Sequence, residues 1–94
     1  MISARNIIRH ELIGLSAVVV RASNPTHVGI AGPIVDETRN TVRIRSVKGI
    51  RIVPKDRSLF RLTLPDGTRV EVEGSRLIGA PERRVTLRPE KEQR

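Results

Sequence analysis

The sequence contains no cysteine, tryptophan or tyrosine, and Phe60 is its single aromatic residue. Without cysteine, the chain has no disulfide, no thiolate nucleophile and no cysteine-ligated zinc. With one aromatic side chain, it has little means of stacking nucleic-acid bases on aromatic surfaces. No apolar run approaches the length of a transmembrane helix, and residues 1–14 are too polar for a signal peptide. We therefore expect a soluble protein that resides in the cytoplasm.

Acidic residues are also scarce relative to basic ones. Ten Asp and Glu residues stand against eighteen Lys and Arg residues, so the net charge is +8. Such a balance favours a polyanionic partner. The chain has no basic amphipathic helix with bulky apolar anchors, which makes an anionic membrane surface the weaker choice. At 94 residues, the chain has room for one domain with a small core.

Short apolar segments with turn residues between them fill most of the chain. Residues 1–14 have helical apolar spacing, with Ser3 as a possible N-cap and Gly14 at the C-terminal end, so we predict a short helix there. The apolar period then changes to two. This pattern predicts six strands, over residues 15–23, 27–37, 41–47, 50–54, 58–65 and 68–74. Six closely spaced strands predict an all-β barrel or sandwich, and residues 81–94 are expected to form a charged, partly disordered tail.

The segment TVRIRSVKGIRIVPK, over residues 41–55, has no acidic residue, and its basic residues are Arg43, Arg45, Lys48, Arg51 and Lys55. A three-residue turn over residues 47–49 collects the Val and Ile side chains of this hairpin on one face. The four strand cations then share the other face, with Lys48 at the tip. A two-residue turn would mix Arg with Ile on both faces, so burial favours the first register. In that register Arg45 lies opposite Arg51, a like-charge pair that costs up to about 1 kcal/mol.

The predicted hairpin over residues 58–74 has a different charge pattern. With a three-residue turn over residues 65–67, Phe60 and the strand Leu and Val residues face inward, and Arg61 lies opposite Glu71. That outer face is neutralised, whereas the face of the 41–55 hairpin is not. Arginine forks bind phosphate oxygens in a bidentate manner. We therefore predict a phosphate-binding surface formed by Arg43, Arg45, Lys48, Arg51 and Lys55. The alternative is an ordinary solvated or edge-protecting charged strand.

No set of residues has the pattern of a catalytic or metal site. Asp36 and Glu37 are adjacent, so on a strand they point to opposite faces, and we interpret them as turn residues. His10 and His27 have no second histidine or carboxylate at ligand spacing. Glycine-rich phosphate loops and nucleophile elbows are also absent. The sequence therefore predicts no catalytic residue, no metal ligand and no enzymatic activity of the chain on its own.

Four motifs together resemble archaeal ribonuclease P protein component 1: HELIGL at 10–15, VGIAGPIVDETRNTVRI at 28–44, VPK at 53–55 and GSRLIGAPERR at 74–84. The resemblance covers nearly the whole chain, although the family usually has arginine where this chain has Ala80. It implies a small Sm-like or SH3-like antiparallel barrel over residues 15–80. It also implies a non-catalytic, RNA-binding subunit of ribonuclease P, the endoribonuclease that removes 5′ leaders from precursor tRNA. The RNA subunit carries the active site and uses Mg²⁺, so we expect this chain to bind no cofactor.

The resemblance also implies the partners of the chain. Members of this family bind ribonuclease P RNA, pair with a small zinc-ribbon protein subunit and act with other ribonuclease P proteins. Carried onto this sequence, the interface with the zinc-ribbon subunit comprises Ile7, Ile8, Leu12, Val28 and Ile30. The same residues could instead cap the protein's own barrel. Two other functions stay open from the residues alone: an SH3-like-barrel ribosomal or other RNA-binding protein, and a protein-only scaffold.

Overall fold

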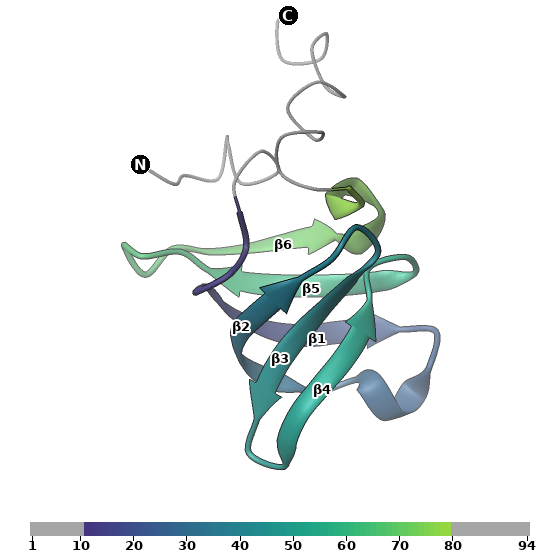
Figure 1. The fold of residues 1–94 in the computed structure, drawn as a ribbon. Coiled ribbons are helices and arrows are strands. Elements are labelled where there is room, and N and C mark those ends of the chain that lie inside the picture. The colour runs from purple at the N-terminus through teal and green to yellow at the C-terminus, as the bar shows by residue number, and fades with distance from the viewer. Residues whose placement is uncertain (1–10, 80–94) are drawn as a thin grey trace, which may run out of the picture.

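A computed structural model describes residues 11–79, which form six antiparallel strands and no α-helix (Figure 1). The strands are β1 (Ser16–Ala22), β2 (Ala31–Glu37), β3 (Thr41–Ser46), β4 (Gly49–Pro54), β5 (Ser58–Thr63) and β6 (Arg69–Glu73). Short 3-10 helices follow β1 and β6, namely η2 (Pro25–His27) and η3 (Gly74–Leu77). The prediction of six strands is confirmed, although β4 begins one residue earlier and β2 begins four residues later, at Ala31, than predicted. Residues 11–14 do not form a helix, and the rest of the predicted helix and the predicted tail lie outside the described residues.

The strands form a bent sheet with the order β4-β3-β2-β1-β5-β6. In Figure 1, β3 and β4 cross over β1 and β5, and β2 connects the two parts because it pairs with both β1 and β3. Within residues 11–79, the edge strands β4 and β6 do not pair with each other, so the predicted barrel is present as a bent, open sheet. The edges approach at one end, where a Cβ on Gly74 would overlap the carbonyl oxygen of Lys55.

All six strands contribute to one hydrophobic core. Phe60 is its largest apolar member and is 1% exposed. The other members are Leu12, Leu15, Ala17, Val19, Ile30, Ile34, Val42, Ile44, Val53, Leu62, Leu64, Val72 and Leu77. The core therefore joins both parts of the bent sheet, and it also includes Leu12 and Ile30, which the sequence assigned to a partner interface.

The predicted register of the β3–β4 hairpin is wrong. Ser46 pairs with Gly49, which leaves a two-residue turn, and Ile50 and Ile52 are 49% and 52% exposed. The cause is the edge position of β4. On its inward side only two side chains are buried, those of Val53 in the strand and of Lys55 directly after it. Once Val53 and Lys55 point inward, Ile50 and Ile52 must point outward, because successive strand residues alternate in direction.

The β5–β6 hairpin has the predicted register. Arg61 pairs with Glu71, and the Leu64 N–H donates to the Thr68 carbonyl at 2.8 Å, which closes the three-residue turn. Gly67 occupies the left-handed region with φ of 91°. The Thr68 backbone N–H donates to Asp66 Oδ1 at 2.9 Å, and this bond, with a weaker one from the Thr68 hydroxyl, lowers the pKa of Asp66. This turn is therefore fixed by local hydrogen bonds as well as by burial of the strands.

Replacing Phe60 with alanine is expected to lower the free energy of unfolding by about 3–5 kcal/mol, because the cavity forms in the centre of the core. Ile52→Ala is the control and should cost less than about 1 kcal/mol, since Ile52 is half exposed on an edge strand. Urea unfolding followed by far-UV circular dichroism measures both. A loss for Ile52→Ala as large as that for Phe60→Ala would support the three-residue turn and contradict the register described above.

Candidate nucleic-acid interface

The outward face of the β3–β4 hairpin carries two of the predicted phosphate-binding residues. Arg43 and Arg45 are exposed, and they alternate along β3 with buried Val42 and Ile44. Across the hairpin, Arg43 pairs with Ile52, and Arg45 pairs with Ile50. We call these four exposed residues, Arg43, Arg45, Ile50 and Ile52, the outer hairpin face. The predicted like-charge pair between Arg45 and Arg51 does not exist, so its expected cost to stability does not apply.

Arg51 and Lys48 lie on the other side of the hairpin. Arg51 pairs with Ile44 and is half-buried. Together with Lys48 and Ser46, it lines a pocket of about 270 Å³ between the β3–β4 turn and residues 26–31. The expectation of one face that contains all the cations of this hairpin is therefore wrong. The same two-residue turn that exposes Ile50 and Ile52 divides the arginines between two sides.

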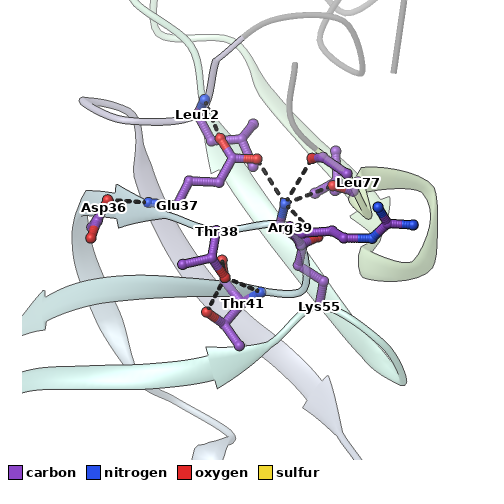
Figure 2. A network of polar contacts seen from close by, with 9 residues as sticks. Leu12, Asp36, Glu37, Thr38, Arg39, Thr41, Lys55 and Leu77 are labelled. Carbon is purple, nitrogen blue, oxygen red and sulfur yellow. Dashed lines mark hydrogen bonds and ion pairs between the residues drawn. The ribbon is translucent and has the colours of Figure 1, made fainter. Parts of the chain in front are cut away.

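Lys55 is fully buried, which contradicts its assignment to the exposed surface. Its ammonium donates to Glu37 Oε2 at 2.8 Å, as Figure 2 shows. It also donates to the carbonyl oxygens of Leu77 at 2.8 Å and of Arg39 and Gly79 at 3.3 Å. Each of these acceptors is a protein oxygen, so Lys55 is part of the internal structure and not of a phosphate-binding face.

Glu37 completes this network. Its Oε1 accepts the Leu12 N–H at 3.2 Å, while Oε2 pairs with Lys55, and the two charged side chains are 4% and 0% exposed (Figure 2). The Lys55 N–H also donates to the Asn40 carbonyl at 2.8 Å. Glu37, which we interpreted as a turn residue, therefore stabilises the fold through a buried ion pair and a backbone hydrogen bond. The sequence carried one signal of this pair: Lys55 follows Val53 at the strand period of two, and so shares the inward face of β4.

Within residues 11–79, the cations of the β3–β4 hairpin other than Lys55 have no carboxylate partner. No ion pair joins Arg43, Arg45, Lys48 or Arg51 to an acidic side chain anywhere in residues 11–79. Asp36 lies opposite Arg43 in the β2–β3 register, but its Oδ1 accepts the Glu37 N–H at 2.9 Å. On β5, by contrast, Arg61 contacts Glu71 Oε2 through two nitrogens, at 2.7 and 3.2 Å. The predicted difference in charge compensation between the two hairpins is confirmed.

The three described residues of the predicted protein interface, Leu12, Val28 and Ile30, do not form one surface. Leu12 and Ile30 are buried in the protein's own core, so their side chains stabilise this fold. Val28 is 49% exposed, but it precedes β2, whereas Leu12 contacts Glu37 at the other end of that strand. The two remaining residues, Ile7 and Ile8, lie outside the described part of the chain.

The geometry of residues 11–79 also bears on metal binding and on membrane crossing. These residues contain no cluster of three His, Cys, Asp or Glu side chains that could hold a metal ion. None of their helices is both long enough and apolar enough to cross a membrane.

Comparison with known proteins gives the family. The family described as "Ribonuclease P/MRP, subunit p29" matches residues 5–87. The chain belongs to this family. Ribonuclease P protein component 1 of Methanocaldococcus jannaschii is 49% identical over 86 residues, which cover 90% of each chain. The protein of the same name from Methanothermobacter thermautotrophicus is 48% identical over 86 residues, covering 90% of this chain and 92% of that one.

A solved structure supports the same assignment. It is described as "Mth11: A homologue of human RNase P protein Rpp29", and it is 44% identical, with a TM-score of 0.59. The alignment covers 79% of this chain and 96% of that one. The resemblance seen in the sequence is therefore confirmed: this ribonuclease P protein acts in tRNA processing. Membership of this complex implies that it assembles with RNA and with other protein subunits.

Replacing Lys55 with methionine is expected to lower the free energy of unfolding by about 3–5 kcal/mol, because the carboxylate of Glu37 stays buried after its ion pair with the Lys55 ammonium is lost. Glu37→Gln keeps an acceptor for the Leu12 N–H and removes the charge. The double variant should lose less stability than the sum of the two single losses, since no unpaired charge is left. Urea unfolding of the four proteins measures the coupling, and additive losses would show that the pair does not act as a unit.

Proposed function

We propose that this subunit supplies no catalytic group to ribonuclease P and binds phosphates of the ribonuclease P RNA through Arg43 and Arg45. The observation that carries the proposal is that both arginines are exposed, side by side on one strand, and without an ion-pair partner in residues 11–79. An exposed guanidinium presents a planar fork of donors, which suits phosphate oxygens. The buried residues between the two arginines fix their spacing along β3.

The outer hairpin face suits the RNA backbone better than base edges. The only aromatic side chain, Phe60, is buried, so it offers no stacking surface. Ile50 and Ile52 beside the arginines provide apolar contact for sugars but no hydrogen bonds to bases. Recognition on this face is therefore expected to follow RNA shape and phosphate positions, as in proteins that bind structured RNA. Neutralising phosphates in this way would help the RNA fold compactly and accept an anionic precursor tRNA.

The absence of a catalytic role is supported by the positions of the carboxylates. Glu37 is committed to Lys55 and the Leu12 N–H, and Asp36 accepts the Glu37 N–H. Neither belongs to a cluster of three or more His, Cys, Asp or Glu side chains that could hold a metal ion in this part of the chain. We assign the Mg²⁺-dependent chemistry to the RNA subunit. A zinc-ribbon protein subunit remains the proposed protein partner.

The protein, purified free of RNA, is expected not to cleave precursor tRNA over a range of Mg²⁺ concentrations. Addition of the ribonuclease P RNA and the other protein subunits should restore removal of the 5′ leader, which gel analysis of labelled precursor tRNA detects. Cleavage by the RNA-free protein would refute the non-catalytic assignment.

Arg45→Ala is expected to reduce the salt dependence of binding to ribonuclease P RNA, because one phosphate contact is lost. The slope of log affinity against log salt should fall in magnitude by about 0.7–0.9. Arg61→Ala is the matched control, since it removes the same charge from an exposed strand position whose partner is Glu71. Filter binding or fluorescence anisotropy at several salt concentrations measures both slopes. Equal changes for Arg45→Ala and Arg61→Ala would place the RNA elsewhere on the protein.

A further inference from the structure

A cleft lies on the side of the β3–β4 hairpin opposite to Arg43 and Arg45. One wall is formed by residues 26–31, which lead from η2 into β2, and the other by the two-residue turn and Arg51. Figure 1 shows η2 and the β3–β4 turn at the same end of the molecule. We call this site the turn cleft and define it by the residues used below: Thr26, Val28, Ser46, Val47, Lys48 and Arg51.

The turn cleft has a positive charge that no acidic side chain of residues 11–79 neutralises. Its lining contains Lys48 and Arg51 and no carboxylate. Neither cation forms an ion pair with any acidic side chain in the described segment, so the two like charges share one hollow. A bound anion would relieve this repulsion and accept charge-assisted hydrogen bonds from both side chains. The charge of the cleft therefore favours a phosphate-bearing ligand.

The hydroxyl groups of the cleft are already committed to the protein. Ser46 Oγ donates to the Gly49 carbonyl at 2.8 Å and accepts the Lys48 N–H at 3.1 Å. Thr26 Oγ1 bonds to Asn24 Oδ1 at 2.7 Å. These bonds hold both walls of the cleft in position before a ligand arrives. Among the side chains that line it, the ones left to bind an anion are Lys48 and Arg51.

The rim of the turn cleft is apolar. Val47 is fully exposed at the tip of the hairpin, and Val28 is 49% exposed on the opposite wall. Two solvated valines lie beside two cations that have no ion-pair partner within residues 11–79. This combination suits the two parts of a nucleotide, a flat apolar base and an anionic phosphate. Flipped nucleobases are held between apolar side chains in other proteins. The volume, about 270 Å³, lies just below the ~300–1,000 Å³ range of small-molecule pockets and suits a ligand of about one nucleotide.

We propose that the turn cleft binds one unstacked nucleotide of a single-stranded RNA segment, with its phosphate on Lys48 and Arg51 and its base against Val28 and Val47. This inference rests on the proposed function, because it takes RNA as the partner. It adds a second, different contact: the outer hairpin face binds phosphates of folded RNA, while the turn cleft on the reverse side selects an unpaired nucleotide. A base-paired nucleotide cannot enter, since its base stays within the helix.

The test uses the full chain and two fluorescein-labelled probes, hexauridylate and a short RNA duplex, with affinities measured by anisotropy. Lys48→Ala and Arg51→Ala should each weaken hexauridylate binding about tenfold, as expected for the loss of one charge-assisted contact. Val47→Ser should weaken it about threefold through lost apolar contact, without changing the salt slope. Duplex binding should change little in Lys48→Ala and Val47→Ser. Both of these positions are exposed, so they can be changed without disturbing the core.

Arg61→Ala is the charge-matched control and should leave hexauridylate binding unchanged. Equal hexauridylate affinity for the unaltered protein, Lys48→Ala and Arg51→Ala would overturn the proposal. So would an equal loss for hexauridylate and duplex, or an unchanged affinity in Val47→Ser, which would mean a phosphate contact alone. Tighter binding of a polyglutamate peptide than of hexauridylate would assign the cleft to an acidic protein segment instead. Each of these results leaves the Arg45→Ala comparison on ribonuclease P RNA intact, so failure of the cleft is distinguishable from failure of the proposed function.

Discussion

The buried ion pair between Lys55 and Glu37 is the interaction on which the arrangement of this protein depends. It joins the residues before β1, the end of β2, the end of β4 and η3, which also meet through backbone hydrogen bonds and in the hydrophobic core. Burying two charges is costly unless each finds several partners. Here the ammonium contacts one carboxylate oxygen and three carbonyl oxygens, and both carboxylate oxygens are used. The network therefore stabilises only one mutual placement of these segments.

The placement of Lys55 also determines which charges reach the surface. Because Lys55 points inward at the end of β4, Val53 and Arg51 point to the same side, and Ile50 and Ile52 point to the other. A shift of β4 by one residue would reverse every one of these directions. The separation of Arg51 from Arg43 and Arg45 is thus a consequence of a contact at the far end of the hairpin.

Much of the fold could be predicted from the sequence, and the exceptions share a physical cause. The six strands and the register of the β5–β6 hairpin could be predicted from apolar alternation, because the inward-facing side chains of β5, Phe60 and Leu62, are buried. The register of β4 could not be predicted in this way. On an edge strand exposed isoleucines are tolerated, so the alternation of apolar residues does not determine which side chains are buried. The same three-residue-turn register placed Lys55 on the surface with the arginines, and full burial of a lysine is rare. The exposed arginines of β3 were predicted correctly, because buried residues alternate with them.

The pairing of β1 with β5 has a consequence for the order of folding. Ser16 pairs with Thr63, so this part of the sheet forms only after a long loop has closed, and loops of this kind slow folding. The β3–β4 hairpin lies entirely within that loop and needs only local contacts across a two-residue turn. A nascent chain can therefore form the cationic β3–β4 hairpin first, before β5 pairs with β1 and completes the core.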